Sequence, residues 1–123
     1  MSNYRKQLGD KGERAAEEYL RGLGYEIVES DVTFWGGQLD MVCRKGATIV
    51  FVEVKTRTHS DCQSAPETLS YRQLKTIIRA ARLWLYGRKI YENDHYWQVD
   101  LLYCHPMADQ WAFELFSDVA FLR

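Results

Sequence analysis

The sequence predicts a small mixed α/β sandwich, in which helices flank one sheet of five strands. Segments with helical and strand periodicity follow one another in the order helix, three strands, helix, two strands. The helix between the third and fourth strands implies a right-handed crossover, which makes those two strands parallel in an otherwise largely antiparallel sheet. At 123 residues, the chain is expected to form a single domain over residues 1–123.

Composition and charge limit the function classes to which the chain can belong. Hydrophobic residues make up 46% and aromatic residues 14%, which is typical of a globular protein and argues against disorder. The net charge of −1 excludes a polybasic protein that coats nucleic acid indiscriminately, but it allows a local basic patch. No apolar run is long enough to cross a bilayer and the first residues contain no apolar export segment, so we expect a cytoplasmic protein without membrane contact.

The three cysteines are an odd number and suit reduced thiols better than a disulfide framework. A zinc site is the alternative, because two short segments could pool four soft ligands. These residues are His59, Cys62, Cys104 and His105. Their spacing lacks a paired C-x-x-C knuckle, so we interpret them as loop and strand residues.

The first element is an amphipathic helix over about residues 4–22, because its apolar positions recur at helical spacing. Gly9, Gly12 and Ala16 form a strip of small residues, which lets the helix approach closely whatever it packs on. Glu13 borders that strip. A solvated surface carboxylate and a carboxylate held near a site are both open interpretations of Glu13 at this point.

A short strand is predicted over residues 25–30, followed by a connection over residues 31–37. Two glycines in that connection permit unusual backbone dihedrals or a close approach of the backbone to another group. A hairpin of two strands then occupies residues 36–57. It carries charges inside otherwise apolar runs, and these charges need an explanation.

The second helix is predicted over residues 70–87, after a polar loop. Ser70 and Gln73 are spaced as a capping box at its start. Its buried stripe is expected to comprise Leu74, Ile77, Ile78, Ala81, Trp84 and Leu85. Two further strands follow over residues 95–104 and 110–116, joined by a turn that contains Pro106.

Two registers of the hairpin must be compared, in which Arg44 pairs with either Thr48 or Ile49. In the first register, Asp40 faces Val52 and so lies among valines. In the second register, the apolar residues of both strands share one face. Hydrophobic patterning therefore favours the second register, since a slip by one residue would exchange the two faces.

The favoured register also gathers the polar residues of the hairpin. Its apolar face comprises Leu39, Met41 and Cys43 opposite Val54, Val52 and Val50. Asp40 then lies directly opposite Glu53, with Lys55 and Gln38 as the next neighbours.

Two carboxylates about 5 Å apart on a sheet repel one another, and partial burial increases the cost. A hard divalent cation such as Mg²⁺ would compensate them, since it binds carboxylate and amide oxygens. Lys55 shares a face with Glu53 and could steer a phosphate or stabilise developing negative charge. An ordinary cross-strand salt bridge on a solvated face is the alternative, and the pattern alone leaves both open.

Five blocks of the sequence resemble, in order, the YraN family of small nuclease-like bacterial proteins. The blocks are GDKGERAAEEYLRGLGYEIVES, GGQLDMV, FVEVKTR, YWQVDLLY and ELFSDVAF, and they cover nearly the whole chain. That family is similar to archaeal Holliday-junction resolvases and to the PD-(D/E)xK nuclease superfamily. The resemblance implies a restriction-endonuclease-like mixed sheet of order α-β-β-β-α-β-β, with helices flanking the sheet.

The resemblance also implies roles for the residues at matching positions. In such nucleases an aspartate and a glutamate bind Mg²⁺ or Mn²⁺, which places the metal on Asp40 and Glu53. A lysine orients or activates the attacking water, which is the role implied for Lys55. A glutamate of the first helix commonly completes the site, which is the role implied for Glu13.

The sequence departs from the family pattern at two positions. Gln38 stands where the family usually has glutamate, and its neutral amide can still ligate a metal through oxygen but should weaken metal binding. Gln73 stands where relatives often have lysine. Reduced or lost activity is therefore a second possibility implied by the sequence.

The segment from residue 69 to residue 91 carries six basic residues and no acidic one. Four of them recur at spacings of three and four and form one stripe on the second helix: Arg72, Lys75, Arg79 and Arg82. With Gln73 and Arg57, this stripe is expected to contact nucleic-acid phosphates in a salt-dependent, sequence-independent way. Trp35 could stack on an unpaired base. A solvated helix face and a tryptophan that covers a core edge are the alternatives.

The sequence thus predicts an endonuclease-like phosphodiesterase that uses Mg²⁺ or Mn²⁺ and acts on DNA, branched or single-stranded structures included. Asp40, Glu53 and Gln38 would hold the metal, Lys55 would assist the nucleophilic water, and Glu13 would complete the site. A catalytically inactive nucleic-acid-binding module and a protein-interaction domain are the rival classes. Analogy with resolvase-like relatives implies a homodimer formed through the exposed apolar strands at the end of the chain.

Overall fold

Seven helices and strands follow one another in the predicted order in the part of the chain that the structure describes. The structure is a computed structural model, and it describes residues 2–58, 69–90 and 96–119, with side chains from residue 6 onward. The elements are α1 (Ser2–Gly22), β1 (Glu26–Phe34), β2 (Gly37–Lys45), β3 (Thr48–Thr56), α2 (Tyr71–Gly87), β4 (Tyr96–Pro106) and β5 (Trp111–Phe116).

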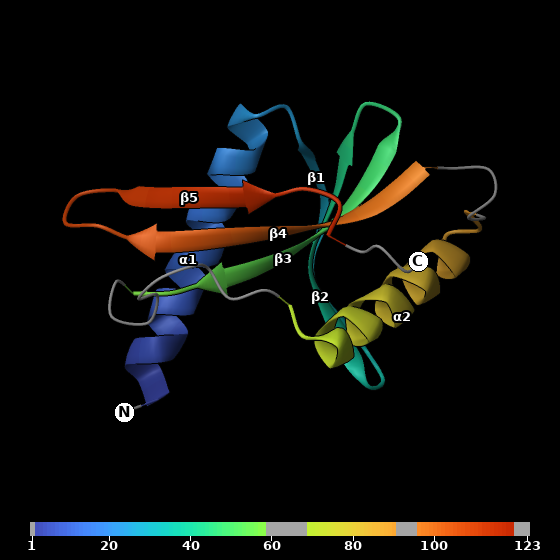
Figure 1. The fold of residues 1–123 in the computed structure, drawn as a ribbon, viewed down its shortest axis with the longest axis horizontal. Helices are drawn as coiled ribbons and strands as arrows, with labels where there is room; N and C mark the ends of the chain where they lie inside the picture. The colour runs from blue at the N-terminus through green and yellow to red at the C-terminus, as the bar shows by residue number, and fades with distance from the viewer. Residues whose placement is uncertain (1, 59–68, 91–95, 120–123) are drawn as a thin grey trace.

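The five strands form one sheet in the order β1-β2-β3-β4-β5 (Figure 1). β3 and β4 are parallel, from Thr48 opposite Tyr96 to Thr56 opposite Cys104, and the other neighbouring pairs are antiparallel. α2 lies between β3 and β4 in the chain, as a parallel pair requires. The predicted restriction-endonuclease-like mixed sheet, flanked by helices, is confirmed.

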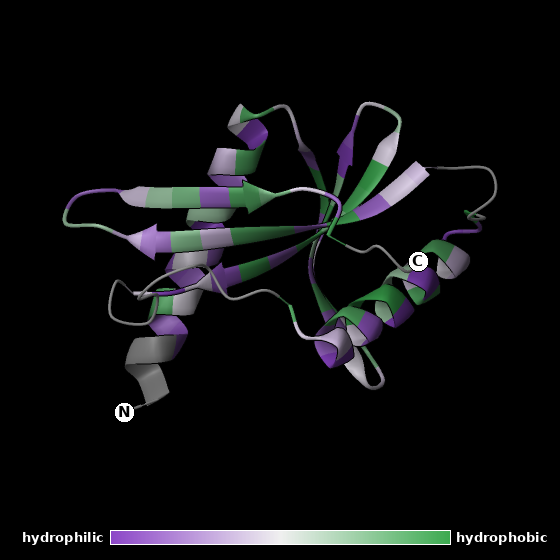
Figure 2. Cartoon of the chain, viewed as in Figure 1, coloured by the Kyte–Doolittle hydropathy of each residue, from purple (hydrophilic) through white to green (hydrophobic). Residues whose placement is uncertain are grey.

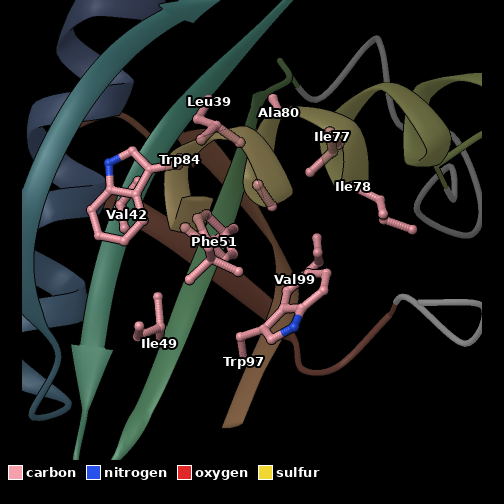
Figure 3. Close-up of a cluster of buried hydrophobic side chains, with 12 residues drawn as sticks. Leu39, Val42, Ile49, Phe51, Ile77, Ile78, Ala80, Trp84, Trp97 and Val99 are labelled. Atoms are coloured by element: carbon pink, nitrogen blue, oxygen red, sulfur yellow. The ribbon is translucent and has the colours of Figure 1, made fainter. Parts of the chain in front are cut away.

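The two helices pack on opposite faces of the sheet, because alternate residues of each strand point to opposite sides. Val50 and Val52 of β3 belong to a core cluster with Ala16 and Leu20 of α1. Ile49, Phe51 and the other side chains of the second cluster pack against α2 (Figure 3). The Phe51 ring stands edge-on to the rings of Trp84 and Trp97, at centroid distances of 5.8 and 5.7 Å.

Gly12 lets α1 approach the sheet closely. A Cβ atom at Gly12 would overlap the Thr56 side chain of β3, and Ala16 is fully buried one turn further along. Gly9, the third member of the predicted strip, would gain no contact within 4 Å from an added Cβ. The close approach therefore depends on Gly12 and Ala16, and it brings the residue next to Gly12 up to the sheet.

The predicted register of the β2–β3 hairpin is confirmed, since Arg44 pairs with Ile49. One part of the prediction is wrong. Met41 and Cys43 pack in the α1 cluster, but Leu39 packs in the α2 cluster, so the apolar face does not continue to Leu39. The alternation breaks at Asp40, where the neighbouring strand β1 also departs from regular β geometry.

β1 is longer than predicted, because it continues from residue 31 to Phe34, a stretch expected to be a connection. Val32 and Phe34 pack against the α2 cluster, and this burial extends the strand. The connection is reduced to a turn of two residues, Trp35 and Gly36, with φ of +85° at Gly36. Glycine takes that conformation without strain.

α2 begins as predicted, with a complete capping box. Ser70 Oγ accepts a hydrogen bond from the Gln73 N–H (3.1 Å), and Gln73 Oε1 accepts one from the Ser70 N–H (3.0 Å). Pro106 lies at the end of β4 opposite Trp111, and not in the turn where it was expected.

A helix that could cross a bilayer is not found among the residues that the structure describes.

Candidate functional site

β2 and β3 separate at Asp40, and the carboxylate of Asp40 lies between them. Their pairing runs from Lys45 opposite Thr48 to Met41 opposite Val52. Beyond this point, the Val54 N–H donates to Asp40 Oδ2 at 2.9 Å. In an unbroken antiparallel ladder a backbone carbonyl would accept such a bond, so the side chain replaces the main chain as the acceptor.

Glu53 and Lys55 lie beside Asp40, although the ladder ends at Met41 and Val52, before the direct pairing of Asp40 with Glu53 that the register predicted. The carboxyl groups of Asp40 and Glu53 are within hydrogen-bonding reach of each other. Lys55 Nζ lies 3.7 Å from Glu53 Oε2, and the side chains of Lys55 and Glu53 are 15% and 19% exposed. The structure therefore brings two carboxyl groups and one amine together at a partly buried point of the sheet.

Burial makes this pair of carboxyl groups resist full ionisation. Burial and the charge of Asp40 together raise the pKa of Glu53 to about 8, and Lys55 offsets part of the increase. Burial also raises the pKa of Asp40, although the hydrogen bond from Val54 opposes the increase. The pair consequently favours retention of a proton at neutral pH, because the Lys55 ammonium compensates only part of two negative charges.

Glu13 is held towards the same region by α1. Burial, followed by the charges of Asp31 and Asp40, raises its pKa to about 7. Asp31 is an acidic neighbour that the sequence interpretation missed. It occupies the β1 position opposite Asp40, between the pairs formed by Ser30 and Val32, and its φ is +53°.

A signal for Asp31 exists in the sequence but is weak. Aspartate is one of the few residues other than glycine that enter the left-handed region, and residues 29–31 of the sequence read Glu-Ser-Asp. Nothing in that run indicates that the strand continues past residue 30, so the sequence pattern predicts a connection at Asp31.

The acidic side chains form two pairs, Asp40 with Glu53 and Glu13 with Asp31. Within the described ranges, no group of three or more His, Cys, Asp or Glu side chains is placed to hold a metal ion. Gln38 is exposed, and its partner in the sheet is Thr33 of β1.

The basic stripe of α2 lies on the surface. Arg72, Lys75, Arg79 and Arg82 are all exposed, and hydrophilic bands alternate with hydrophobic ones along this helix (Figure 2). Gln73, which was predicted to contact nucleic acid, also caps the helix through its side chain.

Arg57 and Trp35 lie at different parts of the sheet. Arg57 follows β3 directly, where its N–H donates to the Cys104 carbonyl at 3.0 Å and its guanidinium donates to the Thr56 carbonyl at 3.0 Å. Trp35 is 88% exposed in the β1–β2 turn. The Arg79 guanidinium carbon lies 5.8 Å from the centre of its ring.

Two of the four residues of the zinc alternative, His59 and Cys62, lie outside the described residues. Cys104 is buried in the α1 cluster. The ring nitrogens of His105 lie 3.2 Å from the Arg57 carbonyl oxygen and 3.3 Å from Glu114 Oε1. These contacts account for the position of His105 as a residue that links neighbouring strands.

Comparison with known proteins places the chain in a family. Residues 12–105 match the uncharacterised protein family UPF0102. The UPF0102 protein of Geobacter metallireducens is 42% identical over 85 residues, which are 69% of this chain and 70% of that protein. The UPF0102 protein of Vibrio cholerae is 33% identical over 103 residues, which are 84% of each chain. The matched region contains all the residues of the candidate site, and the chain belongs to the UPF0102 family.

Proposed function

We propose that this protein is a phosphodiesterase that uses Mg²⁺ or Mn²⁺ to cleave DNA in an endonuclease-like reaction. The observation that carries the proposal is the pairing of Asp40 with Glu53 at the point where β2 leaves β3, with the Lys55 amine 3.7 Å from Glu53. The resemblance of the sequence blocks to nuclease-like proteins and the fold itself support the same chemistry.

The residues at this point fit a divalent cation. Burial disfavours the charged forms of the two carboxyl groups, and a cation in place of the retained proton would let both groups ionise. Mg²⁺ commonly keeps several waters and binds through one or two carboxylates together with substrate phosphates. Two protein carboxylates are therefore enough for a site of this kind.

Each residue of the site has a defined task in the proposed reaction. Asp40 and Glu53 hold the cation, which when bound supplies Lewis-acid stabilisation of the charge on the phosphate. The Lys55 ammonium, kept in place by Glu53, orients the attacking water and offsets negative charge that develops on the phosphate. Glu13, with a pKa of about 7, can accept or donate a proton near neutral pH.

Two features support nucleic acid as the substrate. The four exposed cations of α2 follow one another at spacings of three and four residues, so they line one side of the helix. Such a row can neutralise successive phosphates and would give affinity that does not depend on base sequence. Arg57, which directly follows β3 beyond Lys55, is a further candidate for a phosphate contact.

Gln38 supports a second candidate function, a nucleic-acid-binding module whose site has lost its activity. Gln38 is exposed and lies two residues before Asp40, at a position where the family that the sequence resembles usually has glutamate. A cation bound near Gln38 would therefore have one negatively charged ligand fewer. Gln38→Glu tests this candidate directly. If the missing carboxylate at residue 38 limits the reaction, the substitution increases cleavage at low Mn²⁺ concentration.

Cleavage of labelled DNA tests the proposed function. Single-stranded, duplex, flap and four-way DNA are incubated with the protein in Mn²⁺ or in EDTA, beside Asp40→Asn and Lys55→Ala. We expect cleavage that requires the metal and is lost in both variants. Asp109→Asn, which changes an exposed aspartate between β4 and β5, is the matched control and keeps full activity. Cleavage that persists in EDTA or in Asp40→Asn would refute the proposal.

A further inference from the structure

Two cation–aromatic pairs lie next to each other on the exposed side of α2. Lys75 Nζ lies 5.4 Å from the centre of the Tyr71 ring, and the Arg79 guanidinium carbon lies 5.8 Å from the centre of the Trp35 ring. Tyr71 is 63% exposed and Trp35 is 88% exposed. Each ring therefore has a cation on one side and a large area open to solvent.

The helix sets the spacing of these pairs. Tyr71, Lys75 and Arg79 are successive residues at intervals of four, so they lie on one side of α2, about 6 Å apart from one turn to the next. Trp35 is brought to Arg79 from the β1–β2 turn, where Gly36 with φ of +85° lies against the same guanidinium. The second pair thus joins two elements that are distant in sequence.

This side of α2 is hollowed and positively charged. A groove of about 730 Å³ is lined by apolar side chains such as Leu74 and Ile78, together with Tyr71, Lys75, Arg79 and Arg82. No acidic residue occurs between residues 69 and 90. A ligand that suits this surface brings negative charge together with flat apolar groups, because the groove combines cations and the Tyr71 ring with apolar side chains, and the Trp35 ring lies against one of those cations.

We propose that Tyr71, Lys75, Arg79 and Trp35 form a binding track for single-stranded nucleic acid. Bases stack on the open faces of the Trp35 and Tyr71 rings, and phosphates contact Lys75 and Arg79. A duplex keeps its bases stacked inside and cannot offer them to either ring, so the track selects unpaired strands. The inference rests on the proposed function in naming the kind of DNA that reaches the cleavage site, but it concerns binding alone.

Binding is measured by fluorescence anisotropy in EDTA, with labelled oligothymidylate as the single strand and a hairpin duplex of equal length. We expect Trp35→Ala and Tyr71→Ala each to weaken binding of the single strand about tenfold, and to leave duplex binding unchanged. Trp35→Phe keeps a ring and recovers most of the affinity. Tyr96→Ala, which removes a tyrosine that is 78% exposed at the start of β4, serves as the matched control and binds like wild type.

The salt dependence of binding tests the phosphate contacts separately. Lys75→Gln should reduce the slope of log affinity against log salt by about 0.7 for the single strand, as expected for the loss of one phosphate contact. Trp35 is far more exposed than Trp84 and Trp97. Binding of the oligothymidylate should therefore reduce the quenching of tryptophan fluorescence by acrylamide, and Trp35→Phe should abolish this reduction.

The track is refuted if both alanine variants bind the single strand as wild type does, or if they lose single-strand and duplex affinity equally. This result can be distinguished from a test of the proposed function. Single-strand binding that depends on the two rings, without DNA cleavage, would support the track and contradict the proposed nuclease activity. DNA cleavage with binding that does not depend on the rings would support the nuclease activity and contradict the track.

Discussion

At the scale of single residues, the candidate site depends on one exchange of hydrogen-bond acceptors. Asp40 accepts the Val54 N–H in place of a backbone carbonyl, which keeps its carboxylate between the strands and beside Glu53. The charge of this pair is disfavoured because the pair is largely removed from water. The protein therefore holds an arrangement that is unfavourable without a ligand, as is common where stability is given up for function.

This cost predicts the pH dependence of stability. The pKa of Glu53 is raised from 4.5 to about 8 on folding, so the folded protein favours the protonated carboxyl. The stabilising contribution of that proton is complete below pH 4.5 and is lost as the pH rises through 8. Glu53→Gln removes the titration, and we expect it to raise the free energy of unfolding in EDTA by up to about 4 kcal/mol at pH 8 and by less than about 1 kcal/mol at pH 5.

Thermal unfolding of Glu53→Gln and wild type at the two pH values measures this difference. Glu18→Gln, which neutralises an exposed glutamate of α1, provides the control and should change stability alike at both values. A gain for Glu53→Gln that is as large at pH 5 as at pH 8 would contradict the assignment of the proton to this pair.

At the scale of elements, the site depends on how closely α1 approaches β3. Gly12 touches Thr56, and the next residue, Glu13, lies near Asp31 and Asp40 for that reason. β1 contributes as well, because the left-handed conformation of Asp31 and the break in alternation at Asp40 occur at facing positions of adjacent strands. One helix and three strands thus position the acidic side chains.

Gly12→Ala tests this approach. Replacing glycine by alanine in a helix ordinarily stabilises it by up to about 1 kcal/mol. At Gly12 the new Cβ overlaps the stiff, β-branched Thr56 side chain, and overpacking of this kind costs about 1–3 kcal/mol. We expect net destabilisation in denaturant unfolding.

Two further variants make the test specific. Gly9→Ala, where an added Cβ meets nothing within 4 Å, should be neutral or stabilising. The double variant Gly12→Ala with Thr56→Ala should recover most of the loss, because it removes the two closest atoms. Equal effects of Gly9→Ala and Gly12→Ala would show that helix propensity alone acts here.

Local patterns predicted the elements well. The capping box of Ser70 and Gln73 fixed the start of α2, and apolar alternation identified the register that pairs Arg44 with Ile49. The same alternation failed at Leu39, because it assumes a regular strand and the strand is irregular at Asp40. Irregular backbone leaves little trace in composition, so a rule based on periodicity passes over it.

At the scale of the whole molecule, the two helices cover opposite faces of one sheet (Figure 1). α1 carries Glu13 towards Asp31 and Asp40, while α2 packs on the other face and leaves its cations exposed. The crossover between β3 and β4 was predictable from element order. The pairing of Arg79 with Trp35 was not, because it joins residues of separate elements and depends on how α2 lies over the β1–β2 turn.

Binding of Mn²⁺ at pH 7 tests the central claim most directly, since it asks whether the Asp40–Glu53 pair gives up its proton to a cation. Isothermal titration in buffers of different ionisation enthalpy measures the number of protons released. We expect wild type to bind Mn²⁺ with release of about one proton, and Asp40→Asn and Glu53→Gln to lose that binding. No binding by wild type, or binding that both variants retain unchanged, would contradict the account.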